Sequence, residues 1–201
     1  HSDACTRLPG QKEAMRISRL MSFASAGSAS HAPGFETPLA MLMECHRRVE
    51  DQCATLHRLV PHLEAHGSDQ AAAEAARAVV RYFDLAAPNH HADEEDDLFP
   101  ALLESMAGSD AVCLREMVDS LERDHLTLER QWLALRAVLQ QVIDGAQVRL
   151  EPVAVTAFSA HYAAHIAREE GELLPMAERL LSAQALEDIG RSMRRRRGEK
   201  N

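Results

Sequence analysis

Two eleven-residue segments of the chain repeat one another, and this repeat limits how the chain can fold. Residues 90–100 read HHADEEDDLFP, and residues 165–175 read HIAREEGELLP. When the final prolines are aligned, a histidine, two consecutive glutamates and a leucine coincide as well. A second pair of segments, CHRRVEDQ at 45–52 and DHLTLERQ at 124–131, shares its histidine, glutamate and glutamine. The chain therefore reads as two copies of a helical hairpin.

Turn and capping signals divide the chain into helices that match this repeat. The segment HGSD ends a first helix and supplies an N-cap for a second, and AGSD precedes a third. Asp144 and Gly145 end the third helix, Pro152 suits the first turn of a fourth, and Pro88 is expected to kink the second. Apolar residues recur at helical spacing between these signals. The pattern predicts long helices at 37–65, 69–106, 110–143 and 151–181, and a short fifth helix capped by Ser182.

Long helices joined by short loops pack as antiparallel neighbours. We therefore predict an all-α protein, an up-and-down antiparallel four-helix bundle with an extra short C-terminal helix. The scarcity of aromatic residues, 4% of the chain, also favours helices over sheets. Three parts are expected: a flexible Ser-, Gly- and Pro-rich arm at 1–36, the bundle at 37–183, and the short helix with a basic tail at 184–201.

The repeat places polar residues on the apolar faces of the predicted helices. Residues at i and i+4 share one face of a helix, so His90 and Glu94 can reach one point in the bundle interior. An unpaired buried carboxylate is costly, whereas a cation would compensate buried glutamates and histidines together. The pattern predicts a metal site with the ligands His46, His90, Glu94, His125, His165 and Glu169.

A fifth histidine ligand is open between two interpretations. His161 lies one turn before His165 on the same face and is the preferred extra ligand. The pair His91 and Glu95 offers a competing register, although Ile166 occupies the place of His91 in the other copy of the repeat.

The remaining acidic residues near the motif are interpreted as supporting or solvated groups. We expect a solvated outer face at Asp93, Glu95, Asp96, Asp97 and Glu170. Glu50 and Glu129 lie one turn after the histidines of the first and third helices, where they could support those histidines or face solvent.

Imidazole and carboxylate ligands without a convergent cysteine suit iron, manganese or zinc. Six or seven ligands are too many for one tetrahedral zinc ion, while two carboxylates between two sets of histidines suit a pair of iron ions. Ferritin-like di-iron proteins repeat Glu-x-x-His, an order found here once on these helices, as ERDH at 122–125. The segment HYAAH at 161–165 lacks the glutamate of the HExxH zinc-protease motif.

Four segments carry a resemblance to a known family: ECHRRVE with its His46, HHADEEDDLFP, DHLTLERQ and HIAREEGELLP. Over roughly residues 37–183, the chain resembles the hemerythrin-like (HHE cation-binding) domain family. The resemblance implies a four-helix bundle that holds a non-haem di-iron centre, with Glu94 and Glu169 as the bridging carboxylates. Hemerythrins take two histidines from the third helix, and this chain offers only His125 there.

The resemblance implies that the reduced centre binds dioxygen, nitric oxide or related small ligands. Our first hypothesis is a protein that binds or senses these molecules, or handles iron under oxidative or nitrosative stress. A di-iron oxidoreductase that consumes peroxide or oxidises ferrous iron is the alternative, and a metal-stabilised interaction module is a third class. No dedicated substrate site accompanies the motif, so the sequence leaves an enzymatic role open.

Charge and hydropathy limit the other partners that can be expected. A net charge of −9 argues against nucleic acid, and the run RRRR near the C-terminus is interpreted as a solvated helix end. No apolar run approaches the roughly 20 residues that a membrane span needs. Residues 15–32 start like a secretion signal, but Ser and Gly interrupt their apolar core. We therefore expect a cytoplasmic protein without a membrane partner, and the sequence predicts no oligomeric state.

Overall fold

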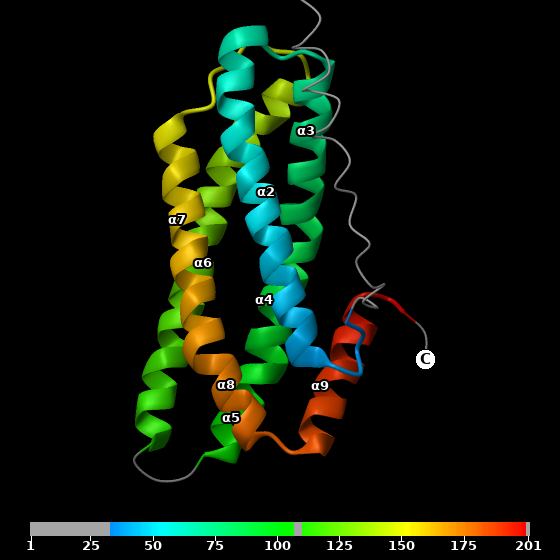
Figure 1. Ribbon diagram of the computed structural model, residues 1–201, viewed down its shortest axis with the longest axis vertical. Coiled ribbons are helices and arrows are strands. Elements are labelled where there is room, and N and C mark those ends of the chain that lie inside the picture. Colours follow the sequence, from blue (N-terminus) through cyan, green and yellow to red (C-terminus); the bar gives the residue numbers. More distant parts are fainter. Residues whose placement is uncertain (1–32, 107–109, 200–201) are drawn as a thin grey trace, which may run out of the picture. The chain divides into compact units, whose positions relative to one another are not determined.

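The computed structural model describes residues 33–106 and 110–199. Most of the predicted N-terminal arm, residues 1–32, lies outside the described residues. Every regular element in the described part is helical, which confirms the predicted all-α class. The helices run up and down beside one another (Figure 1).

The first and third long helices are continuous. Helix α2 spans Pro38–His66, and helix α6 spans Asp110–Ile143, close to the predicted bounds. Gly67 ends α2 with a positive φ of 67°, and Gly145 follows α6 with a φ of 80°. Glycine adopts this left-handed conformation without the steric cost that a side chain would add.

The predicted second helix is helical throughout, but two π turns interrupt its α-helical segments. It consists of α3 (Gln70–Arg81), a π-helical turn η1 (Tyr82–Ala86), α4 (Ala87–Asp93), a second π turn η2 (Glu94–Leu98) and α5 (Phe99–Ser105). The side chain of Asp69 accepts a hydrogen bond from the Ala72 N–H at 2.8 Å, which confirms the N-cap predicted in HGSD.

The fourth long helix has the same construction. It comprises α7 (Pro152–Arg168), the π turn η3 (Glu169–Leu173) and α8 (Leu174–Leu180). Ser182 then caps helix α9 (Ala183–Arg196) by accepting a hydrogen bond from the Ala185 N–H at 3.1 Å. The predicted fifth helix is therefore present, and it includes most of the arginine run that we had assigned to a tail.

A proline stands at the second residue after each π turn. Proline has no N–H, and its ring collides with the carbonyl four residues earlier in a regular α-helix. A π turn widens the backbone by one residue and relieves this collision. The first N–H after each turn therefore donates to a carbonyl five residues back, from Ala87 to Tyr82, from Phe99 to Glu94 and from Leu174 to Glu169. The kink expected at Pro88 takes this form.

The four long helices form a closed ring. Helix α2 packs against α3 and α7, and α6 packs against the same two helices. Two apolar clusters fill the interior, one centred on residues such as Leu56, Leu139 and Phe158, the other on Leu42, Leu121 and Leu173. Between these clusters lies a layer of buried polar side chains. The packing thus places the repeated motifs at one level of the bundle.

Helix α9 packs on α2 and α4, beside the start of α2 (Figure 1). Arg196 and Arg197 both pair with Asp93, and the Arg197 Nη2 atom lies 2.6 Å from Asp93 Oδ2. Asp93 is fully buried. The expectation of a solvated arginine tail beside a solvated Asp93 is therefore wrong, because these charges neutralise one another at the contact between α9 and α4.

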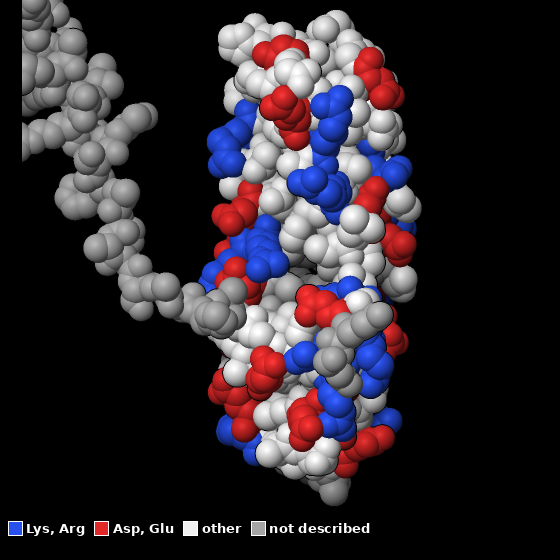
Figure 2. Space-filling view, turned by 90° about the vertical axis from the view of Figure 1, so that its right-hand side faces the viewer, with Lys and Arg blue, Asp and Glu red and all other residues white. Residues whose placement is uncertain are grey.

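Acidic and basic side chains are interspersed on the face shown in Figure 2, and no broad basic area is visible on it. None of the helices in the described residues is both long enough and apolar enough to cross a membrane.

Candidate metal centre

Two groups of four buried side chains meet in the polar layer between the apolar clusters. One ligand atom from each member lies within 4.8 Å of the others in its group. Both groups contain the same two glutamates, Glu94 and Glu169. The first group adds His46 and His90, and the second adds His125 and His165. The structure thus brings together six of the seven residues predicted as ligands.

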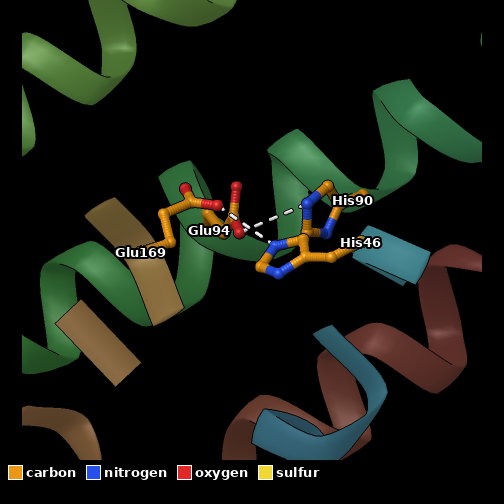
Figure 3. Close-up of side chains that lie close together, drawn as sticks. All are labelled: His46, His90, Glu94 and Glu169. Carbon is orange, nitrogen blue, oxygen red and sulfur yellow. Dashed lines mark ion pairs between the residues drawn. The ribbon is translucent and has the colours of Figure 1, made fainter. Parts of the chain in front are cut away.

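The first group joins α2 to the second and fourth long helices. His46 Nε2 lies 3.1 Å from Glu169 Oε2, and His90 Nε2 lies 3.5 Å from Glu94 Oε1. Both carboxylates point toward the two imidazole rings (Figure 3). All four side chains are at most 2% exposed, so the surrounding helices shield them from water.

The second group lies on the opposite side of the same carboxylates. His125 Nε2 lies 3.4 Å from Glu94 Oε2, and His165 Nε2 lies 3.1 Å from Glu169 Oε1. The Nε2 atoms of these two histidines lie 3.1 Å apart. Glu94 and Glu169 therefore each turn one oxygen toward each group, which is the arrangement of a carboxylate that bridges two cations.

The carboxylate oxygens of both glutamates are buried without hydrogen-bond partners in the described part of the chain. The imidazole nitrogens nearby are close, but they do not meet these oxygens along hydrogen-bond directions. Buried polar atoms normally have partners, because an unsatisfied one costs about 1–3 kcal/mol. The donor set, two imidazoles and two carboxylates on each side, fits cations that would satisfy these atoms.

Burial and mutual repulsion give the two glutamates different pKa values. Burial raises the pKa of Glu94, and the charge of Glu169 raises it further. Burial also opposes ionisation of Glu169, but the close approach of the His165 and His46 rings outweighs it and lowers that pKa. Without a cation, one carboxylate is thus held ionised at the expense of the other.

The histidines also divide into two kinds. Burial opposes protonation of His46, but the close approach and charge of Glu169 and the charge of Glu94 raise its pKa to about 9. Burial acts in the same direction on His125, but the close approach of Glu94 and the hydrogen bond to Glu95 raise its pKa to about 10. For His90, burial and the charge of His46 lower the pKa.

The second glutamate of each repeat supports a histidine from the opposite hairpin. His46 Nδ1 donates to Glu170 Oε1 at 2.9 Å, and His125 Nδ1 donates to Glu95 Oε1 at 2.6 Å. Such outer carboxylates fix the orientation of a histidine and increase its basicity as a ligand. Both glutamates are exposed, at 40% and 38%, as predicted for the outer face, but the sequence did not predict their contacts with the histidines.

The supporting role suggested for Glu50 and Glu129 is not observed. Both side chains are exposed, and neither bonds to a histidine in the described structure. Asp124 instead lies on the outer side of His165, with 3.7 Å between its Oδ2 and His165 Nδ1, and Arg168 holds Asp124 at 3.0 Å. Its place directly before His125 in the sequence was the signal that could have drawn attention to it.

His161, the preferred extra ligand, lies outside both groups. Its Nδ1 atom lies 3.3 Å from Gln131 Oε1, and its Nε2 atom lies 3.4 Å from Asp124 Oδ1. The side chain is 22% exposed. One helical turn separates His161 from His165, which moves it along the bundle axis and away from the shared carboxylates.

His91 lies closer to the centre than His161 does, although it belongs to neither group. Its ring stacks on that of His125, with centroids 3.9 Å apart and planes inclined by 9°. The His91 Nε2 atom is buried and has no hydrogen-bond partner among the described residues. Burial, with the charge of His125, lowers its pKa. The partner of the competing register, Glu95, bonds to His125 instead.

Both shared glutamates begin a π turn, Glu94 in η2 and Glu169 in η3. π turns inside α-helices occur frequently at functional sites, because the extra residue redirects the side chains that follow. Here each turn presents two successive glutamates, of which the first faces the interior and the second reaches an outer imidazole nitrogen. The π turn that accommodates the proline at the end of each motif thus also orients the glutamates that precede it.

Comparison with known proteins agrees with this geometry. The model of the hemerythrin HHE cation-binding domain matches residues 37–177. A Haemophilus influenzae protein described as uncharacterized is 36% identical over 160 residues, which cover 80% of this chain and 90% of the relative.

Proposed function

Because the chain belongs to the hemerythrin HHE cation-binding domain family, we propose that it is a non-haem di-iron protein that binds or senses dioxygen or nitric oxide, or handles iron under oxidative or nitrosative stress. The observation that carries the proposal is the shared position of Glu94 and Glu169. Each carboxylate offers one oxygen to each pair of histidines, so two cations would share both bridges.

The donor set also supports a reactive centre. Each cation would receive two imidazole nitrogens and two carboxylate oxygens from the chain. Nitrogen and oxygen donors suit iron, and four protein donors leave positions that a small molecule can occupy. When bound, iron would supply redox chemistry, while the chain supplies a buried site in which Glu95 and Glu170 orient His125 and His46.

Metal analysis and visible spectra of the freshly purified protein test the proposal. We expect two irons per chain, and a change in visible absorption when the anaerobically reduced protein meets dioxygen or nitric oxide. A colourless protein that contains only zinc would contradict the proposal. One ion per chain would contradict the shared bridging role of Glu94 and Glu169.

A di-iron oxidoreductase is the second candidate, because a cavity reaches the centre from the surface. The cavity has a volume of about 550 Å3 and is lined in part by His125 and His91. Such a volume is within the range of small-molecule sites, and it exceeds what a diatomic ligand requires. Catalytic loss of peroxide or of ferrous iron in the presence of the protein would favour this candidate over a reversible binding protein.

A further inference from the structure

The cavity beside the metal centre opens between η1, α4 and α6, and Tyr162 of α7 also lines it. Aromatic rings form much of its wall. The centroid of Phe83 lies 4.9 Å from that of Trp132 and 5.7 Å from that of Tyr162. Trp132 Nε1 donates to Asp84 Oδ1 at 3.0 Å, which fixes the indole ring in place. The cavity is therefore a built feature with an ordered wall.

His91 lies between this cavity and the two ligand groups. It lines the cavity, and its ring also stacks on His125. The His91 centroid lies 5.8 Å from that of His90 and 6.4 Å from that of His165. Of the cavity-lining residues, His125 belongs to a ligand group and His91 stacks on it, so a molecule that moves from the cavity toward the shared carboxylates would move past these two rings.

The far end of the His91 side chain is the unsatisfied part of it. Nε2 is among the ring atoms most distant from the backbone. The atom is buried and has no hydrogen-bond partner among the described side chains and backbone groups. A buried imidazole nitrogen without a partner is costly, and a molecule bound beside it would remove this cost.

We propose that His91 is the gate between the cavity and the metal centre, and that its Nε2 atom is the hydrogen-bond partner of a small ligand bound there. The ligand class is a small anion whose atom beyond the metal is a strong hydrogen-bond acceptor, as in azide or hydroperoxide; the oxygen of bound nitric oxide is a weaker acceptor. The inference rests on the proposed metal centre but not on iron as its metal. It makes His91 a positioning residue that favours such ligands over nitric oxide.

Azide bound to the cobalt(II)-loaded protein tests the hydrogen bond without requiring iron. We expect the azide stretching band to shift when H2O is exchanged for D2O, because an exchangeable proton contacts the ligand. An insensitive band in the wild-type protein would overturn the proposal. Failure to find iron in the purified protein would overturn only the di-iron function, so the two failures are distinguishable.

Two variants separate the hydrogen bond from the gate. His91→Phe keeps a flat ring against His125 but removes both nitrogens. It should weaken azide binding about five- to tenfold, abolish the solvent-isotope shift and change nitric oxide affinity on the iron-loaded protein less than twofold. His91→Ala should weaken azide similarly but increase its association rate, because the ring no longer blocks the route.

His57→Phe is the matched control, since His57 is an exposed histidine of α2 outside the cavity and both ligand groups. It should leave azide affinity, band position and association rate unchanged. Azide binding that is unaltered in both His91 variants would overturn the proposal. An equal loss of azide and nitric oxide affinity in His91→Phe would also overturn it, because that result indicates general damage to the centre.

Discussion

The two glutamates of each repeat have different structural roles, although they are adjacent in the sequence. Glu94 is completely buried between the two groups, whereas Glu95 is 40% exposed and holds His125 from outside. Helical phase correctly placed Glu94 inside the bundle. It could not place Glu95 against His125, because phase at 100° per residue fails across a π turn and ignores the reach of a long side chain.

This difference predicts unequal effects of two substitutions on metal binding. Glu94→Ala should remove at least half of the bound metal, because both groups lose an oxygen donor. Glu95→Gln should retain the metal but lower its affinity about 10- to 100-fold, because His125 loses only its outer carboxylate. Metal content after dialysis and competition with a chelator measure these effects.

Glu129→Gln is the control for these variants, since Glu129 is exposed and no hydrogen bond or ion pair joins it to a histidine of the described residues. Its metal content and affinity should equal those of the wild type. Complete loss of metal from Glu95→Gln, equal to that from Glu94→Ala, would contradict the assignment of Glu95 as an outer support.

Protons compete with metal at His46 and His125. Their pKa values of about 9 and about 10 in the metal-free protein keep both protonated at pH 7. A cation at Nε2 must displace one proton from each ring, while Nδ1 still donates to its carboxylate. Calorimetric titration in buffers of different ionisation enthalpy should therefore show release of about two protons near neutral pH, and metal affinity should increase as the pH rises toward these values.

The same shifts act in the opposite direction on the stability of the metal-free protein. Histidine in an unfolded chain has a pKa of about 6.5, and the folded values are higher. The stabilisation is therefore fully present below about pH 6.5 and is lost as the pH rises through about 9 and about 10. Urea unfolding of the metal-free protein across this range measures it, and a stability that increases with pH there would contradict the assignment.

At the scale of elements, α9 is attached to the metal-binding helix by charge. Arg196 and Arg197 converge on Asp93, which stands between His90 and Glu94 in α4. The sequence predicted α9 itself, because Ser182 is a strong N-cap. The sequence did not predict the ion pairs, because two solvated helix faces can also contain a run of arginines and a run of acidic residues.

Removal of Asp93 should therefore be costly for a residue on an apparently acidic surface. Asp93→Ala leaves two partly buried guanidinium groups without their shared partner and should lower the free energy of unfolding by about 2–4 kcal/mol. Chemical denaturation measures this loss, and limited proteolysis should show faster cleavage near α9. Arg191→Ala, which breaks only exposed pairs within α9, should change stability by less than about 1 kcal/mol.

At the scale of the whole molecule, the two hairpins contact one another reciprocally at the candidate metal centre. Glu95 of the first hairpin supports His125 of the second, and Glu170 of the second supports His46 of the first. The sequence repeat predicted two equivalent hairpins and an up-and-down bundle. It did not predict this reciprocal exchange, because equivalence of two copies does not determine which copy each side chain contacts.

The sequence repeat also could not predict at which level along the bundle axis each site residue lies. The polar layer separates two apolar clusters, so the core is divided in the middle by groups that water does not reach. Periodicity identifies the inner face of a helix but not the level at which faces from four helices meet. His161 illustrates the limit, since it shares a face with His165 but contacts Gln131 and Asp124.

A polar layer across the core makes the stability of the bundle depend on metal. The unpartnered oxygens of Glu94 and Glu169 destabilise the metal-free protein, and a cation that binds only the folded state stabilises it. At a free metal concentration 100 times the dissociation constant, the gain is about 2.7 kcal/mol. Metal removal should therefore lower the melting temperature, as calorimetry before and after chelation would show.

Two variants distinguish this linkage from general loss of packing. Glu169→Ala should abolish most of the difference between metal-loaded and metal-free protein, because both groups lose a donor. Leu128→Ala, in the apolar cluster on one side of the layer, should lower the stability of both forms by a similar amount of about 2–5 kcal/mol. If the chelated wild type melted at the temperature of the loaded protein, the buried glutamates would have to be satisfied without metal, and the two-cation interpretation of their shared oxygens would fail.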